Sequence, residues 1–136
     1  MTDGEHLHEL SRGECLELLQ YHSFVGRLGF LASGGGPMIL PVNYLADETS
    51  VVFCTAPGSE LGRLDDAAPV VFEVDDSRPL EHSGWSVVVR GVARAVTDPD
   101  EVEALNRGPL RSWAATPPVQ WMRVTIQEIT GRRIGR

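Results

Sequence analysis

Residues 51–75 hold the side chains best placed to bind a ligand, because an apolar run there is followed by Gly58 and Ser59. We expect a strand, a turn at these two residues, a short helix over residues 59–64 and a second strand from Pro69. A helix that begins directly after a strand points its first backbone N–H groups outward, and these groups carry partial positive charge. The pattern predicts an anion-binding turn suited to a phosphate monoester, although a serine that only caps a surface helix has the same local sequence.

The other reactive side chains do not form a recognisable catalytic set. His6 and His8 make an HxH pair in the N-terminal tail, where a solvated pair is a simpler interpretation than a metal site. Ser59 and Ser86 have no histidine at helical or strand spacing, so a hydrolytic triad is not supported. We therefore expect no metal site, and the sequence assigns no catalytic acid or base.

All twelve basic residues are arginines, and the absence of lysine excludes two kinds of chemistry. The chain cannot form a lysine aldimine, and it cannot form the P-loop of nucleoside triphosphatases, which requires a lysine. Its formal net charge of −7 argues against a surface that binds nucleic acid.

The length of 136 residues predicts a single domain over residues 1–136, with a loose tail over residues 1–9. Cys15 and Cys54 form no CxxC motif and are typical of small buried residues in a reducing compartment. The first residues lack the basic start and apolar core of a signal peptide, and no apolar run reaches membrane length. We expect a cytoplasmic protein that does not bind a membrane.

Six strands and two or three short helices are expected to position the candidate residues. A helix over residues 12–21 follows a capping box at Ser11 and Glu14, and a second helix up to residue 107 begins after Asp98 and ends at Gly108. Polar loops are expected over residues 76–83 and 108–120. The strands are expected over residues 24–32, 38–45, 50–55, 69–75, 85–96 and 121–129.

Short strands joined by hairpins predict a mainly β fold, a small antiparallel barrel. Gly91 lies in the middle of the longest predicted strand, where a barrel strand can bend. A doubly wound sheet would need a regular alternation of strands and longer helices, which the chain does not have.

Seven segments occur in an order and spacing that resemble one family: LSRGECLELL, VGRLGFL, PVNY, TAPGSEL, VVFEVD, GWSVVVRGVA and QWMRVTIQEITGRRI. The chain resembles the pyridoxamine 5′-phosphate oxidase-like FMN-binding split barrels, in particular their short bacterial, nitroimidazole-resistance-like branch. The resemblance covers about residues 10–134. It implies a six-stranded antiparallel split barrel that forms a homodimer, with FMN held in two clefts at the subunit interface.

The resemblance also implies which residues contact the cofactor. The residues expected under the flavin ring are Pro41, Val42, Asn43 and Tyr44. Those expected at its edge are Phe53, Cys54 and Thr55. Those expected around the phosphate are Gly58, Ser59, Glu60 and Leu61. The partner subunit is expected to close the site with Trp85, Ser86 and Trp113, and Trp121 is expected near the dimer seam. Without the family, ordinary packing explains each tryptophan equally well.

Two positions depart from the family pattern. Glu60 stands where related chains usually carry lysine or arginine, and a carboxylate beside a phosphate is repulsive by on the order of 1 kcal/mol. Arg63, one turn further on, can take the basic role, as can Arg27 or Arg90 from a neighbouring strand. Gln120 replaces a histidine that is frequent before the aromatic residue, which removes a possible proton donor.

Three functions follow from this comparison. The first is an FMN-binding oxidoreductase that acts on an unknown small organic substrate, in which the flavin supplies the redox chemistry. The second is a reductase of the same fold that uses the deazaflavin F420, an association suggested by the arginine- and glycine-rich composition. The third is a non-enzymatic ligand-binding barrel that has lost its flavin, and Glu60 motivates it.

Overall fold

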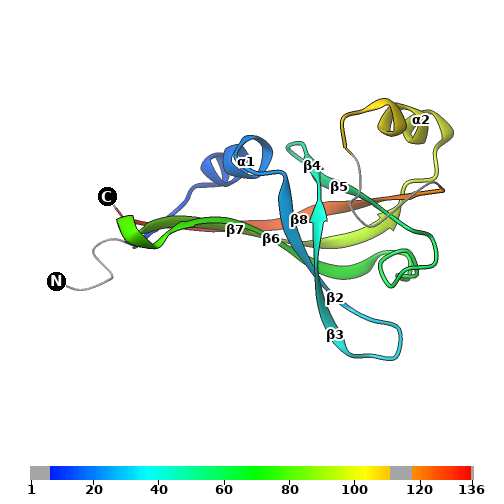
Figure 1. The fold of residues 1–136 in the computed structure, drawn as a ribbon, viewed down its shortest axis with the longest axis horizontal. Coiled ribbons are helices and arrows are strands. Elements are labelled where there is room, and N and C mark those ends of the chain that lie inside the picture. Colours follow the sequence, from blue (N-terminus) through cyan, green and yellow to red (C-terminus); the bar gives the residue numbers. More distant parts are fainter. Residues whose placement is uncertain (1–6, 111–117, 136) are drawn as a thin grey trace.

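The computed structural model describes residues 7–110 and 118–135 of the chain. Two α-helices, one 3₁₀ turn and eight strands follow one another along it (Figure 1). The helices are α1 (Arg12–Tyr21) and α2 (Pro99–Arg107), and the 3₁₀ turn is η2 (Pro79–Glu81). The strands are β1 (Leu7–Glu9), β2 (Val25–Leu31), β3 (Pro37–Asn43), β4 (Leu45–Ala46), β5 (Ser50–Thr55), β6 (Ala68–Arg78), β7 (Ser83–Ala95) and β8 (Gln120–Ile134).

The strands form one antiparallel sheet in the order β3-β2-β6-β7-β8-β5-β4, with β1 paired to β8. The sheet is strongly curled into a half-barrel, and the long strands β6, β7 and β8 run across the molecule between the two helices (Figure 1). The predicted mainly β, antiparallel fold with short helices is therefore confirmed. Neither helix of the described residues has the length and apolar character needed to cross a membrane.

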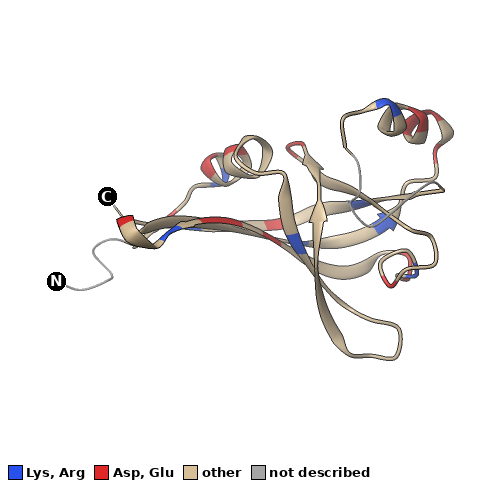
Figure 2. Ribbon diagram, viewed as in Figure 1, with Lys and Arg blue, Asp and Glu red and all other residues tan. Residues whose placement is uncertain are grey.

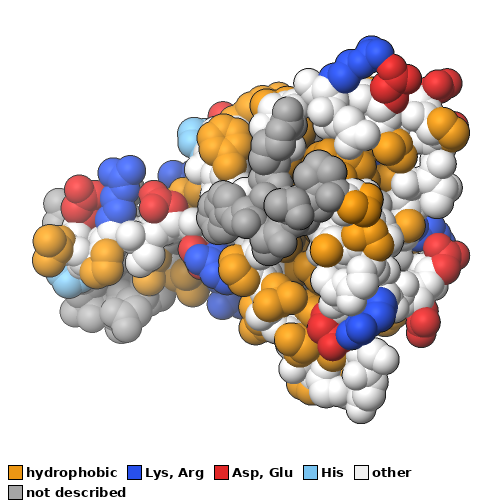
Figure 3. Space-filling view, turned by 45° about the vertical axis from the view of Figure 1, so that its right-hand side comes forward, with side chains coloured by type: hydrophobic (Ala, Val, Ile, Leu, Met, Phe, Trp, Pro, Cys, Tyr) orange, Lys and Arg blue, Asp and Glu red, His pale blue; other side chains and the backbone are white. Residues whose placement is uncertain are grey.

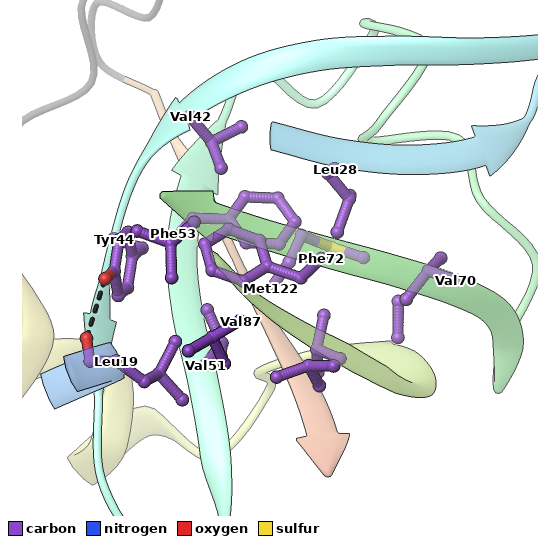
Figure 4. Packing of buried hydrophobic residues seen from close by; sticks show 14 of the residues in the cluster. Leu19, Leu28, Val42, Tyr44, Val51, Phe53, Val70, Phe72, Val87 and Met122 are labelled. Atoms are coloured by element: carbon purple, nitrogen blue, oxygen red, sulfur yellow. Dashed lines mark hydrogen bonds between the residues drawn. The ribbon is translucent and has the colours of Figure 1, made fainter. Parts of the chain in front are cut away.

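The inner, concave face of the sheet holds the core, in which Tyr44, Phe53 and Phe72 are almost completely buried (Figure 4). The rings of Tyr44 and Phe72 meet edge to face with their centroids 4.8 Å apart. The phenol hydroxyl of Tyr44 donates a hydrogen bond of 2.6 Å to the carbonyl of Leu19 in α1. This contact satisfies both buried polar atoms and ties the helix to the barrel. We call the opposite side of the sheet its outer face.

Gly91 marks an irregularity in β7, as the sequence predicts. The register between β7 and β8 shifts between Arg90 and Gly91, which is a β-bulge. A Cβ atom at Gly91 would lie 2.0 Å from the carbonyl oxygen of Thr125, so no larger residue fits this backbone. The bulge lets the two longest strands bend together.

Both helices begin as the sequence predicts. Ser11 and Glu14 form the expected capping box of α1, and the backbone N–H of Ser11 lowers the pKa of the Glu14 carboxyl. Asp98 caps α2 by accepting a hydrogen bond of 3.0 Å from the N–H of Glu101. Cys15 is free and fully buried, and this burial raises the pKa of its thiol.

The prediction of a polar loop over residues 76–83 is wrong. Strand β6 continues to Arg78, which pairs with Ser83 at the start of β7. Most of these residues are exposed on both faces, so their sequence lacks the apolar alternation that would reveal a strand. Backbone pairing alone holds them in the ladder. A three-residue 3₁₀ turn and His82, with φ of 50°, close the hairpin.

Further boundaries differ from the prediction of six strands, and the last strand, expected to end at residue 129, continues to Ile134. Residues 7–9 of the expected loose tail form β1, which pairs with residues 132–134 at the end of β8. The predicted strand over residues 38–45 ends at Asn43, and Tyr44 turns into the core before the two-residue strand β4. Residues 1–6 lie outside the described part of the chain.

Candidate functional site

Residues 56–64, between β5 and β6, form consecutive turns and not the predicted helix. The segment has one bond of helical type, from the N–H of Arg63 to the carbonyl of Ser59 at 3.1 Å. Gly62 lies so close to the carbonyls of Ala56 and Pro57 that a Cβ atom there would be 2.4 and 2.6 Å from their oxygens. Because the chain folds back more tightly than a helix allows, no helix dipole contributes to anion binding here. We call this segment the 56–64 turn.

Ser59 is used inside the turn and does not act as a simple helix cap. Its N–H donates to the carbonyl of Ala56, and its hydroxyl donates to the same carbonyl at 2.7 Å. The hydroxyl also accepts from the N–H of Gly62 at 3.1 Å and lies 2.8 Å from the hydroxyl of Thr55. Within the described residues, the N–H groups of Glu60 and Leu61 have no hydrogen-bond partner, so the turn still offers two backbone donors.

Gln120 belongs to the same cluster. Its side-chain amide donates a hydrogen bond of 3.2 Å to the carbonyl of Gly62, which fastens the turn to the first residue of β8. The residue that departs from the family pattern at this position therefore positions the 56–64 turn. No local pattern signals this contact, because 58 residues separate the two partners.

Arg63 is the basic group that accompanies the turn, and it already pairs with Glu60. Its guanidinium donates to one carboxylate oxygen of Glu60 at 3.0 Å, while the other oxygen is buried without a hydrogen-bond partner in the described part of the chain. The alternative bases lie on the outer face of the sheet. Arg27 forms ion pairs with Glu73 at 2.8 Å and Asp75 at 3.5 Å. Arg90 of β7 lies opposite Glu128 of β8 in the strand pairing.

A hollow of about 560 Å³ opens between the 56–64 turn, the β2–β3 loop and the start of β6. Glu60, Asp65 and Asp66 line it together with Arg63, so its charged wall has three carboxylates for one guanidinium. A phosphate group with two negative charges meets net repulsion in such a wall. The remaining lining residues are Leu31, Ala32, Ser33, Gly34, Leu64, Ala67, Ala68 and Pro69.

The residues expected around the flavin ring do not all face the same way. Val42, Tyr44 and Phe53 point into the core and present only backbone to the outside (Figure 4). Alternation along β3 places Pro41 and Asn43 on the outer face, where Pro41 is exposed and Asn43 is half-buried. The buried residues Cys54 and Thr55 end β5 just before the turn.

The tryptophans lie in different surroundings. Trp85 and Ser86 are the third and fourth residues of β7 and line a hollow of about 300 Å³ with Arg132, away from the 56–64 turn. Trp85 also packs against the core of its own chain. Trp121 is buried within the chain, where its indole N–H donates to Asn106 of α2 at 2.8 Å. Trp113 lies outside the described residues. One chain therefore does not bring Trp85 and Ser86 together with the turn, and their expected role needs a second subunit.

Reasoning from the sequence missed a cluster on the outer face. Glu73 and Asp75 are two residues apart on β6 and share the guanidinium of Arg27 on β2. Burial, together with the neighbouring Asp75 carboxylate, raises the pKa of Glu73 to about 7 against the opposing effect of Arg27. The alternation in VFEVD contained the signal, because it places both carboxylates on one face.

A curled antiparallel half-barrel with short helices at its ends defines the chain as a split-barrel protein. A family model described as pyridoxamine 5′-phosphate oxidase matches residues 11–133. The chain belongs to this family, and the resemblance read from its seven segments is confirmed.

Similar proteins come from species of Mycobacterium and Corynebacterium. The uncharacterized protein Rv0080 of Mycobacterium tuberculosis is 32% identical over 131 residues, which cover 93% of this chain and 84% of that protein. A Corynebacterium glutamicum protein, crystallised as a candidate pyridoxamine 5′-phosphate oxidase, is 31% identical to this chain with a TM-score of 0.81. The match covers 95% of this chain and 93% of that protein. An FAD binding protein from Mycobacterium smegmatis is 36% identical to this chain with a TM-score of 0.79. The match covers 95% of this chain and 99% of that protein.

Proposed function

We propose that this chain is a flavin-binding oxidoreductase that works as a homodimer. The observation that carries the proposal is its likeness to the FAD binding protein of Mycobacterium smegmatis, which extends over 95% of this chain at 36% identity. Membership of the pyridoxamine 5′-phosphate oxidase family supports the same conclusion. A bound flavin would supply the electron transfer, while the protein binds the cofactor, orients it and shields it from water.

The 56–64 turn fits the anionic end of a flavin in part. The N–H groups of Glu60 and Leu61 and the guanidinium of Arg63 are its available donors, and the carboxylate of Glu60 opposes them. The ring would lie against the backbone of β3 and the side chains of Pro41 and Asn43 on the outer face. Four residues of β2, about 13 Å, separate Leu31 at the hollow from Arg27 beside Pro41. This spacing suits a ligand with a long chain between ring and phosphate.

The second subunit has a specific part in this proposal. Trp85 and Ser86 lie on β7, away from the turn of their own chain. In a dimer they would instead cover the flavin bound by the partner. A reduced flavin ring that is exposed to solvent reacts with dissolved oxygen, so a covering aromatic residue protects the reduced cofactor.

The carboxylate of Glu60 favours FAD over FMN as the resident flavin. An FMN phosphate monoester concentrates up to two negative charges at one point, whereas the two phosphate groups of FAD carry about one charge each. Because the hollow beside the turn holds three carboxylates and one guanidinium, the less concentrated charge meets less repulsion there.

The proposal is tested by purifying the chain without added cofactor, recording its visible spectrum and titrating the apoprotein with FMN, FAD and F420. We expect flavin absorption bands or micromolar binding of a flavin, with FAD bound more tightly than FMN. Binding of F420 alone would assign the chain to the deazaflavin-dependent reductases. Absence of bands together with no binding of any of the three would refute a redox role and leave a barrel that has lost its cofactor.

A further inference from the structure

Most arginines of the described chain already have a carboxylate partner. The arginines in ion pairs are Arg27, Arg63, Arg78, Arg94, Arg107 and Arg123. Arg90 of β7 and Arg132 of β8 form no ion pair with any residue that the structure describes, although Glu128 lies opposite Arg90 in the strand pairing. The chain has a net charge of −7, and acidic side chains are prominent on α1, α2 and the hairpin ends (Figure 2). These two arginines are available to bind an anion from outside the chain.

Both arginines line one hollow of about 450 Å³ on the outer face of β7 and β8. In the strand pairing, Arg132 lies opposite Ser86 and Thr130 lies opposite Val88. Arg90 lies opposite the residue four positions before Arg132 on β8, so the two arginines flank the hollow from positions about 13 Å apart along the strands. The side chains that line the hollow are those of Ser86, Val88, Arg90, Glu128, Thr130 and Arg132. Two guanidinium groups, two hydroxyls and one apolar side chain therefore share the hollow with one carboxylate.

Local strand geometry explains why these side chains share one face. Alternation along β7 buries Val87 and Val89 in the core, so the residues on either side of them face outward. On β8, Gly131 faces α1 on the inner side of the sheet, so its two neighbours face outward as well. The β-bulge after Arg90 ends the hollow, because residue 127 of β8 has no partner on β7. Bulges often lie beside binding sites, where they change the direction of a side chain.

The balance of charge in this hollow is opposite to that beside the 56–64 turn. Here two guanidinium groups accompany one carboxylate, whereas the hollow beside the turn has three carboxylates and one guanidinium. Figure 3 shows basic and acidic side chains on the narrow end of the molecule, where β7 begins and β8 ends, and hydrophobic side chains gathered on the broad end. Guanidinium groups bind carboxylate and phosphate oxygens through paired N–H groups, and hydroxyls donate to the same oxygens. The volume of the hollow is that of a site for a small organic molecule.

We propose that this hollow binds a small organic oxyanion, a carboxylate or a phosphate ester, between Arg90 and Arg132, and that this anion is the substrate of the proposed oxidoreductase. The inference rests on the proposed function, in which Ser86 covers the flavin of the partner subunit. Because Ser86 also lines the hollow, the bound anion would lie beside that flavin. Two arginines that hold the charged groups of the substrate would fix the orientation of its carbon skeleton towards the ring. The apolar side chain of Val88 would contact that skeleton.

Neighbouring carboxylates limit the affinity of the hollow but do not line it. Glu73 and Asp75 of β6 lie opposite Val88 and Ser86, and both form ion pairs with Arg27 of β2. Their charge lowers the positive potential on this part of the outer face. Charge-assisted hydrogen bonds from two exposed arginines then support a dissociation constant of about 0.1–10 mM. We therefore expect the site to release its ligand readily, as a substrate site must.

Isothermal titration calorimetry of the full-length protein as purified, with succinate and with phenyl phosphate at constant ionic strength, tests the site. We expect at least one of these anions to bind, and Arg90→Gln and Arg132→Gln each to weaken its binding about tenfold. Tighter binding of succinate would assign a carboxylate ligand, and tighter binding of phenyl phosphate a phosphate ester. Arg133→Gln is the matched control and should bind as the unmodified protein does, because Arg133 is exposed on the opposite face of β8. No binding of either anion, or unchanged binding in either variant of Arg90 and Arg132, would overturn the site.

The place of the anion beside the flavin is tested separately. In protein loaded with FAD or FMN, the bound anion should change the visible absorption spectrum without releasing the flavin. Arg132→Gln should bind the flavin as the unmodified protein does and lose this change at the same anion concentration. Release of the flavin by the anion would show that the hollow belongs to the cofactor site, and an unchanged spectrum despite bound anion would place the hollow away from the ring. Either result would overturn the assignment of the anion as substrate. If the chain binds the anion but no flavin, the proposed function fails while the anion site stands.

Discussion

Replacing Glu60 by lysine tests where the anionic end of the ligand lies. The Glu60 side chain is one third exposed and pairs with Arg63 at 3.0 Å, so its charge is partly screened and partly neutralised. Lysine would restore the charge that the family usually places at this position. It would also release Arg63 from its ion pair, so two cations would face the bound phosphate.

The expected gain follows from the charges involved. Two unit charges about 6 Å apart interact by about 0.7 kcal/mol in water and by about 2.8 kcal/mol at the effective dielectric constant of a protein surface. Because Glu60 is partly exposed, we take about 1 kcal/mol for each unit of charge changed. Glu60→Lys changes two units and should tighten FMN binding about 30-fold, whereas Glu60→Gln changes one and should tighten it about fivefold.

The assay is fluorescence titration of apoprotein with FMN and with FAD at constant ionic strength. The FMN gain should exceed the FAD gain, and higher salt should reduce both. Glu48→Lys in the turn between β4 and β5 is the control for a general effect of charge. If Glu60→Lys and Glu60→Gln bind both flavins as the unmodified protein does, the phosphate does not lie at the 56–64 turn and the reasoning fails. Weaker binding by both variants would mean that Glu60 accepts a hydrogen bond from the ligand.

Three further predictions concern the scaffold. Tyr44→Phe removes the donor to the buried carbonyl of Leu19 and should lower the free energy of unfolding by about 1–2 kcal/mol in urea denaturation. Gly91→Ala should cost at least about 2 kcal/mol or prevent folding, because its Cβ would lie 2.0 Å from the carbonyl of Thr125; Gly13→Ala is the matched control. Partial burial would raise the pKa of Asp47, but hydrogen bonds from residues 49 and 50 lower it overall. A carboxyl whose pKa is lower in the folded than in the unfolded protein stabilises the fold at pH values above its unfolded pKa of about 4. This contribution is lost as the pH falls through the folded pKa. Asp47→Asn should therefore be less stable than the unmodified protein at pH 7, and the difference should be smaller at pH 3 in thermal unfolding. An equal difference at both pH values would contradict this account.

Local signals in the sequence predicted the parts of the fold that local physics determines. The capping box at Ser11 and Glu14 and the cap at Asp98 depend on residues three apart, so the sequence alone identifies them. Gly91 predicted the irregularity in β7 because a glycine inside a long strand often marks a bulge or a bend. The hairpin over residues 76–83 was missed because backbone pairing holds its strands, and its exposed polar side chains show no apolar alternation.

The candidate site was predicted less completely. Gly58 and Ser59 correctly marked a turn, but the contacts that decide its shape involve Gly62 and Gln120, which meet only in the fold. The sequence identified Arg63 as the basic residue near the turn without showing that Glu60 already binds it. The roles of the residues expected around the flavin stay predictions.

The two ends of the sheet limit how copies of this chain can meet. Strand β3 forms one end and carries prolines at positions 37 and 41, which have no N–H to offer a further strand. The other end is β4, which is only two residues long. A third edge is β1, which pairs with the last residues of β8 and is three residues long. Short edge strands and prolines on an edge are features that limit the addition of a foreign strand to a sheet. A sheet that does not lengthen sideways leaves its broad surface for the contact between subunits that we propose.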